Sequence, residues 1–104
     1  MTRQRLANRR AALTFDFEHA GLKYTATVGR FPAGRVAEVF IQNHKSNSDA
    51  DVNARDAAII LSFALQHGAD ISAIGRALFR DPRGNPSGIM GVVLDLISKE
   101  DGVS

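Results

Sequence analysis

Residues 14–41 alternate between apolar and polar side chains with the two-residue period of β-strands, and this pattern restricts the fold more than any other feature. Phe15 and Phe17 alternate with acidic residues, and residues 22–28 continue the pattern. The dipeptide at residues 20–21, Ala-Gly, separates these two stretches, and glycine tolerates the positive φ that a tight hairpin turn requires. The pattern predicts an antiparallel hairpin.

A second turn signal, residues 31–35, contains one proline and one glycine and precedes a third apolar stretch. That stretch, residues 36–42, is apolar on both faces apart from Glu38. A strand that is apolar on both faces is typical of the most buried position in a sheet. We therefore expect three strands in an antiparallel meander.

The remainder of the chain has the patterns of helices. We expect a first helix over residues 51–67, with Ser48 or Asp49 as its N-cap and Gly68 as its stop signal. Two later helices are predicted over residues 72–79 and 88–99. The fold class is therefore predicted as α+β, a three-stranded antiparallel β-meander followed by two or three helices packed on one face.

With 104 residues, the chain is long enough for one core. We expect a single domain over residues 14–104, preceded by a basic arm at residues 1–13. The arm carries Arg3, Arg5, Arg9 and Arg10. Such an arm can bind nucleic acid or an acidic partner, or it can be a solvated chain end.

The composition excludes several classes of chemistry. The chain contains no cysteine, which excludes disulfides, thiolate zinc sites and cysteine nucleophiles. The basic start is followed by no apolar signal core, and no apolar run approaches the roughly 18 residues of a membrane span. We therefore expect a cytoplasmic protein.

Two of the predicted helices are more apolar than a small monomer requires. The first helix has only narrow polar stripes, and Asp95 is the one charged interior position of the last. A helix that is apolar on all sides must be covered on more than one side. We therefore predict a homo-oligomer, a dimer or higher, with one helix at the interface.

The start of the first helix is a candidate anion site. Lys45, Ser46 and Ser48 precede a helix N-terminus, where free backbone N–H groups and the helix dipole attract anions. The alternative is ordinary capping, because Asp49 and Asp51 place carboxylates in the first turn. The sequence leaves both interpretations open.

A second loop, residues 80–88, also places arginines ahead of a helix. Arg80 and Arg83 precede glycines that would let the backbone approach an anion, but the loop lacks the Lys-Ser/Thr ending of a nucleotide P-loop. The alternative is a simple turn in which Ser87 caps the last helix.

No catalytic or metal-binding arrangement is recognisable. His19, His44 and His67 are predicted on a strand end, a loop and a helix end, without metal-ligand spacing. We therefore expect no enzyme activity, no metal and no cofactor.

A helix-turn-helix is a competing interpretation of residues 64–78. Ala64, Gly68 and Ile74 have the spacing of that motif, and Arg76 could contact DNA. The predicted recognition face nevertheless offers few long polar side chains. DNA binding therefore stays open as an alternative function, and so does a purely structural module that docks another protein.

Several short motifs from Gly21 onward belong together. They are Tyr24-x-Thr-x-Val-Gly29, Gly34-Arg35 before Glu38-Val39-Phe40, Lys45 leading to Ser48, the SFALQHG helix end, and Ile74 to Leu78. With these features the chain resembles the TSCPD domain, found at the C-terminus of vitamin B12-dependent ribonucleotide reductases and as small stand-alone bacterial and phage proteins. The family's Thr-Ser-Cys-Pro-Asp sequence is replaced here by Asn85-Pro-Ser-Gly-Ile89, so any role of that cysteine is absent.

The resemblance implies an antiparallel sheet backed by helices and an association with nucleotide metabolism. It favours a non-catalytic module that binds a nucleotide-like or phosphate-bearing ligand or assists nucleotide-handling machinery. Arginine forks and helix-end amides suit phosphate. The predicted ligand-binding residues are Lys45, Ser46 and Ser48, with Arg30 and Arg35 from the strand turn, and Arg80 or Arg83 from a neighbouring subunit. Tyr24 or Phe40 could stack a base, although strand aromatics also serve as core residues.

Overall fold

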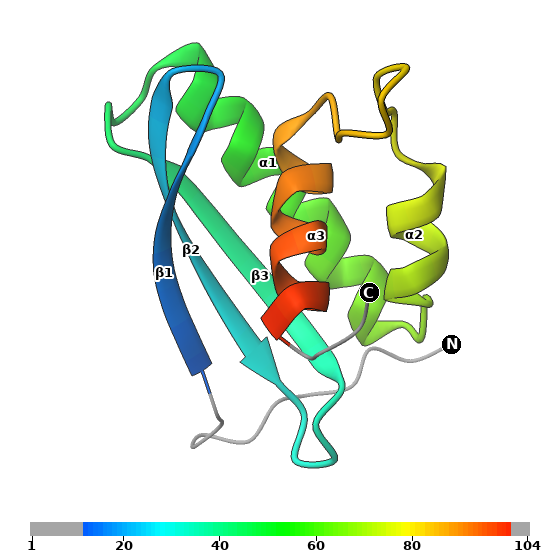
Figure 1. Cartoon of the computed structure of the whole chain (residues 1–104). Coiled ribbons are helices and arrows are strands. Elements are labelled where there is room, and N and C mark those ends of the chain that lie inside the picture. The colour runs from blue at the N-terminus through cyan, green and yellow to red at the C-terminus, as the bar shows by residue number, and fades with distance from the viewer. Residues whose placement is uncertain (1–11, 101–104) are drawn as a thin grey trace. The chain divides into compact units, whose positions relative to one another are not determined.

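The computed structural model describes residues 12–100, and these residues divide between Ala69 and Asp70 into two compact units. The first unit contains β1 (Ala12–His19), β2 (Leu22–Arg30), β3 (Val36–Asn43) and α1 (Asp49–Gln66) (Figure 1). The second contains α2 (Ile71–Ala77) and α3 (Ile89–Glu100). A three-stranded antiparallel sheet followed by three helices confirms the predicted α+β class. Whether residues 14–104 behave as one domain stays a prediction.

The strands form a meander in the order β1-β2-β3. The β1–β2 turn uses positive φ at Ala20 (52°) and Gly21 (78°), as the hairpin prediction required. β1 begins at Ala12, two residues before the predicted start, because Gly29 and Val28 of β2 supply partners for Ala12 and Leu13. The rest of the predicted basic arm, residues 1–11, lies outside the described residues.

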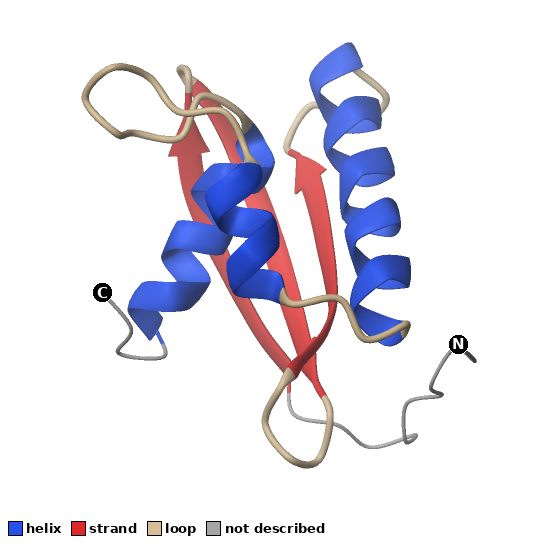
Figure 2. Cartoon of the chain, turned by 90° about the vertical axis from the view of Figure 1, so that its right-hand side faces the viewer, coloured by secondary structure: helices blue, strands red, loops and turns tan. Residues whose placement is uncertain are grey.

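Helix α1 runs beside β3 in the opposite direction and covers the outer edge of that strand (Figure 2). The Ser62 hydroxyl accepts a hydrogen bond from the Val39 N–H (2.9 Å), and the Gln66 amide donates to the Ala37 carbonyl (3.1 Å). The Asn43 N–H donates to the Asp51 carboxylate (2.9 Å). Side chains of α1 therefore satisfy backbone groups of β3 that no fourth strand pairs.

The ends of α1 follow the predicted capping signals. The Ser48 side chain accepts a hydrogen bond from the Asp51 N–H, so the helix begins at Asp49 rather than at the predicted Asp51. His67 is the C-cap, and Gly68 follows with a φ of +94°. The positive φ at a glycine directly after the C-cap is the usual way in which an α-helix stops.

Alternation along the strands gives the sheet two different faces. One face carries buried side chains, among them Tyr24, Ala26 and Val28, so the interpretation of Tyr24 as a core residue is confirmed. The opposite face, called the polar face below, carries the Thr25 and Thr27 side chains on β2. Glu38 on β3 is buried, in agreement with the prediction that this strand is the most buried.

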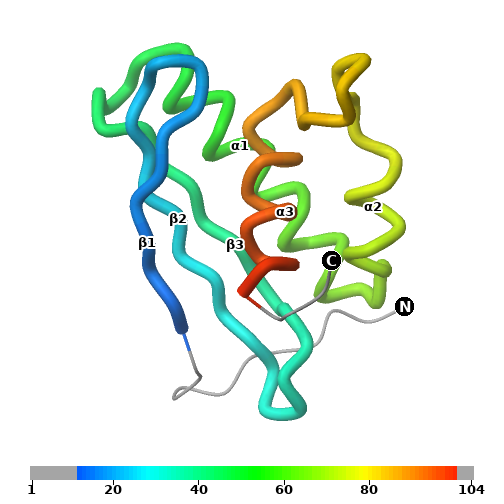
Figure 3. Tube along the Cα trace, viewed as in Figure 1, coloured from blue at the N-terminus to red at the C-terminus, as the bar shows by residue number. Residues whose placement is uncertain are grey.

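The second unit is built around a loop between two helices (Figure 3). Asp70 caps α2, and the helix ends at Ala77, earlier than the predicted Phe79, because Leu78 is already extended (ψ 151°). A bridge between Arg80 and Pro86 closes the following loop. Helix α3 begins at Ile89, so Gly88, whose carbonyl accepts the Val92 N–H, holds the N-cap position instead of the predicted Ser87. The Ser87 N–H donates to the Phe79 carbonyl.

Candidate functional site

The polar face of the sheet brings side chains from all three strands into cross-strand rows. The registers align Asp16 with Thr25 and Thr25 with Gln42 in one row. The neighbouring row contains Thr27 opposite Phe40. Directly opposite residues of antiparallel strands project on the same face, so these side chains form one continuous surface.

A hollow of about 350 Å³ lies where this surface meets α1. It is lined by Thr25, Thr27, Phe40, Ile41, Gln42, Arg55, Ala58 and Ile59, and we call it the groove. Of its four apolar residues, Phe40 and Ile59 are 49% and 48% exposed, whereas Ile41 and Ala58 are buried. The groove therefore combines a half-exposed aromatic ring with hydroxyl, amide and guanidinium groups, the mixture that is typical of small-molecule sites.

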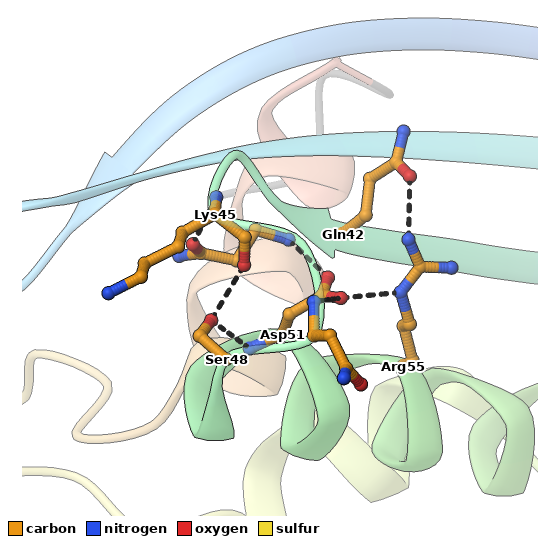
Figure 4. Close-up of polar contacts among 7 residues, drawn as sticks. Gln42, Lys45, Ser48, Asp51 and Arg55 are labelled. Atoms are coloured by element: carbon orange, nitrogen blue, oxygen red, sulfur yellow. Dashed lines mark hydrogen bonds and ion pairs between the residues drawn. The ribbon is translucent and has the colours of Figure 1, made fainter.

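Arg55 is the cation of the groove, and its guanidinium is oriented by two partners (Figure 4). Its Nε donates to the Asp51 carboxylate (2.9 Å), and its Nη2 donates to the Gln42 side-chain oxygen (3.0 Å). The guanidinium has five N–H donors, and the other three have no partner among residues 12–100. Because the Arg55 side chain is 48% exposed, those donors are available to a ligand.

Asp51 connects the groove to the start of α1. Its carboxylate accepts the backbone N–H of Asn47 (2.9 Å) and that of Asn43, as well as the Arg55 guanidinium. The Asn47 N–H is the strongest influence that holds the Asp51 pKa below its usual value; the Asn43 N–H and Arg55 act in the same direction, and burial opposes them. Asp51 is therefore a fixed negative charge at this helix N-terminus.

Thr25 links the groove to a histidine at its rim. The Thr25 hydroxyl donates to the Asp16 carboxylate (2.6 Å) and lies 2.9 Å from His44 Nε2. The Asp16 oxygen is 3.9 Å from the same nitrogen. Because Thr25 gives its proton to Asp16, the His44 Nε2 must donate to the Thr25 oxygen. Asp16 and His44 therefore hold the Thr25 hydroxyl in one orientation at the rim of the groove.

The residues of the first unit that were predicted to bind phosphate lie at opposite ends of β3. Lys45, Ser46 and Ser48 follow the strand, and the Lys45 side chain points away from the capping cluster (Figure 4). The Ser48 hydroxyl bonds the Asp51 N–H and the Lys45 carbonyl, so capping occupies it. Arg30 and Arg35 precede the strand, roughly 25 Å away at the usual rise per residue.

The two turn arginines have protein partners. Arg30 donates to the Gly34 carbonyl (2.9 Å). Arg35 donates to the Leu65 carbonyl (3.3 Å), and its guanidinium carbon lies 4.6 Å from the centre of the Phe31 ring. These contacts hold the β2–β3 turn against the end of α1. One ligand cannot bridge the two ends of β3 without being about as long as the strand.

The second unit contains the other two predicted arginines. Arg80 makes a two-point ion pair with Asp95 (2.8 and 3.0 Å) and also donates to the Gly84 carbonyl. That pair raises the pKa of Arg80 and lowers the pKa of Asp95. The Arg83 backbone N–H donates to the Asp81 carboxylate, and Arg83 itself is exposed. Ligand binding by Arg80 or Arg83 stays a prediction.

Arg55 and the Thr25–Thr27 pair were not predicted as site residues. A usable signal was present, since two threonines separated by one residue on a strand project on the same face. No such local pattern predicts the register of β2 with β3 or the position of α1 beside β3. The groove depends on those long-range contacts.

Three further features of the described residues concern metals, membranes and DNA. Within residues 12–100, no group of three or more histidine, cysteine or acidic side chains could hold a metal ion. The same part of the chain contains no helix that is long and apolar enough to cross a membrane. Helix α2, the predicted recognition helix, has only 7 residues.

The fold and groove define a small α+β module with a hollow of mixed polar and apolar lining between its sheet and its first helix. A segment of 88 residues, 85% of the chain, is 31% identical to the vitamin B12-dependent ribonucleotide reductase of Agrobacterium fabrum (strain C58), and the chain spans 7% of that protein's length. The chain is thus related to a region of a ribonucleotide reductase. No family model matches it, and neither does any solved structure. Membership of the TSCPD family stays a prediction.

Proposed function

We propose that the groove binds a nucleotide-like, phosphate-bearing ligand, and that the protein is a non-catalytic accessory of nucleotide-handling machinery. The observation that carries this proposal is the placement of Phe40 and Arg55 around one hollow of about 350 Å³. A half-exposed ring can stack on a base, and an arginine can hold phosphate through two parallel hydrogen bonds. The similarity to a ribonucleotide reductase region supports a role near nucleotides.

The polar lining supplies the groups that a sugar or base edge requires. The Thr25 hydroxyl donates to Asp16 and can therefore only accept from a ligand, whereas the Thr27 hydroxyl can donate or accept and the Gln42 amide offers both kinds of group. Lys45 lies three residues beyond Gln42, at the end of β3 that also carries His44. Its side chain points away from Arg55 (Figure 4), so Arg55 is the cation that the groove itself offers to a phosphate.

The Thr25–His44–Asp16 cluster does not have the arrangement of an activated nucleophile. A histidine that activates a hydroxyl must accept its proton. Here Asp16 accepts the Thr25 proton at 2.6 Å, and both Asp16 and His44 are exposed to water. The cluster therefore favours ligand positioning over nucleophilic chemistry.

The proposal is tested by thermal shift and by titration with mono-, di- and cyclic nucleotides, inorganic phosphate and short duplex DNA. A ligand at 100 times its dissociation constant stabilises a fold by about 2.7 kcal/mol, which is easily detected. A shift with nucleotides supports the proposal. A shift with duplex DNA alone would favour the helix-turn-helix alternative, and no shift with any of these probes would leave an interaction module.

Two matched substitutions locate the site. Phe40→Ala removes the ring in the groove and should weaken nucleotide binding by about 1–3 kcal/mol, the usual contribution of one stacked base. Phe63→Ala is the control, because Phe63 is 46% exposed on α1 but does not line the groove. Arg55→Lys keeps the charge and loses the planar fork, so it should weaken phosphate-bearing ligands more than nucleosides. Equal binding by Phe40→Ala and Phe63→Ala would place the site elsewhere.

A further inference from the structure

The two edges of the sheet differ in whether their outward-facing backbone groups have hydrogen-bond partners. Side chains of α1 satisfy the outer edge of β3, as described above. No strand among residues 12–100 pairs with the outer edge of β1. In the strand order β1-β2-β3, β1 is at the opposite edge of the sheet from the strand that α1 contacts through these hydrogen bonds. An unpaired strand edge is a template for another strand.

The register identifies the backbone groups on that edge. The His44 N–H donates to the Lys23 carbonyl, so odd-numbered residues of β2 face β3 and even-numbered ones face β1. Ala26 and Tyr24 pair with Phe15 and Phe17 of β1. The odd residues of β1 therefore bond inward. The N–H and C=O groups of the alternate residues face outward, and these residues are Ala12, Thr14, Asp16 and Glu18.

β1 carries few of the features that normally block edge pairing, and its acidic side chains are those of Asp16 and Glu18. Its eight residues, ALTFDFEH, contain no proline, lysine or arginine. All eight pair with β2 without a register shift, so no bulge twists the edge away. Apolar side chains project on one face, and threonine and acidic side chains project on the other. The edge is regular and long enough to accept a partner strand.

We propose that β1 pairs with β1 of a second copy of the chain, antiparallel about a two-fold axis at Phe15, to give a continuous six-stranded sheet. An antiparallel pair of identical strands is related by a two-fold axis perpendicular to the sheet, so like faces stay together. Even-numbered and odd-numbered side chains lie on opposite faces, so each residue must oppose a residue of the second copy that is likewise even or likewise odd. The two-fold axis must therefore pass beside a residue, which then opposes its own copy.

Charge selects among those registers. An axis at Asp16 places two Asp16 carboxylates opposite each other, and an axis at Phe17 places Asp16 opposite Glu18 twice. Like charges directly opposite each other destabilise a strand pair. An axis at Phe15 places Thr14 opposite Asp16 and leaves both carboxylates without an acidic partner. It also pairs seven residues of each strand, against five for an axis at Thr14.

The register at Phe15 makes a specific side-chain contact. Because odd residues bond inward, the two Phe15 residues form a non-hydrogen-bonded pair, with Cα atoms about 4.5 Å apart. Aromatic pairs at such positions stabilise antiparallel strands. Phe17 would oppose Leu13 of the second copy, which extends the apolar contact along the same face.

A single introduced cysteine tests this geometry, because the chain has none of its own. Phe15→Cys should form an intermolecular disulfide under mild oxidation, since its Cα separation falls within the usual range for disulfides. Phe17→Cys is the control. Its two cysteines would lie roughly 13 Å apart along the strands, beyond disulfide reach. Cross-linking of both variants at equal rates, or of neither while both are folded, would overturn the register.

Two substitutions of opposite charge at Thr14 give a second test, which measures the dimer dissociation constant and does not depend on the cysteine variants. Mass in solution over a concentration series should show a monomer–dimer equilibrium for the unmodified chain. Thr14→Asp should raise the dissociation constant several-fold, because it opposes Asp16, whereas Thr14→Lys should lower it. Both variants lose the same contact between the Thr14 and Thr27 hydroxyls (3.0 Å). A chain that stays monomeric throughout, or Thr14 variants that dimerise equally, would disprove the proposal.

Discussion

The Asp51 carboxylate accepts the backbone N–H of Asn43 at 2.9 Å, and this bond ties the first turn of α1 to the last residue of β3. The same carboxylate accepts the Asn47 N–H and orients Arg55 in the groove. One buried side chain therefore connects the helix start, the strand end and the candidate site.

Asp51→Asn should lower the melting temperature clearly. The amide keeps the size of the carboxylate but loses its charge, and one of its two polar atoms can no longer accept a hydrogen bond. Thermal unfolding followed by circular dichroism measures the effect. Asp49→Asn is the control, because Asp49 is exposed in the same helix turn. Equal melting of the two variants would show that the Asp51 contacts contribute little.

Stability should fall in acid partly because of Asp51. Its folded-state pKa is lowered from 3.8, so its contribution is fully present above pH 3.8 and is lost as the pH falls through the lower folded-state value. Asp95 acts in the same direction through Arg80. Urea unfolding at a series of pH values should therefore show a shallower acid loss for Asp51→Asn than for the unmodified chain. Parallel curves would contradict this assignment.

Ser62→Ala should destabilise the first unit by about 1–3 kcal/mol. The substitution leaves the buried Val39 N–H without its partner at 2.9 Å, and an unsatisfied buried donor costs roughly that amount. Urea unfolding measures the loss. Ser46→Ala, at an exposed position before α1, should stay within about 0.5 kcal/mol of the unmodified chain. A neutral Ser62→Ala would mean that water replaces the hydroxyl.

Gly91→Ala and Gly75→Ala should have opposite effects on the second unit. A Cβ at Gly91 would lie 2.7 Å from the Pro86 Cβ, so the loop would have to move. A Cβ at Gly75 would make an ordinary contact with Leu94 at 3.7 Å. Alanine is favoured over glycine in helices by up to about 1 kcal/mol, so Gly75→Ala should raise stability. Destabilisation by Gly75→Ala, or tolerance of Gly91→Ala, would contradict this packing.

Local patterns in the sequence were sufficient for the elements. Alternation predicted the three strands, Ala20-Gly21 predicted the hairpin turn, and Ser48 with Gly68 predicted the limits of α1. Each of these features acts within a few residues, through backbone φ preference, side-chain periodicity or capping. The elements were predicted wrongly only at their ends. Leu78, for example, was predicted within α2, but it is extended and ends the helix, because the loop that follows sets its backbone conformation.

Only the tertiary structure decided the candidate site. The groove requires Thr25 and Gln42 in register on paired strands, and it requires α1 to place Arg55 beside them. The sequence indicated charges that could hold phosphate, but Lys45 and Arg35 lie at opposite ends of β3. Composition and local pattern specify which side chains a segment carries and which face they occupy. Which faces meet is decided by pairing and packing between residues far apart in the chain.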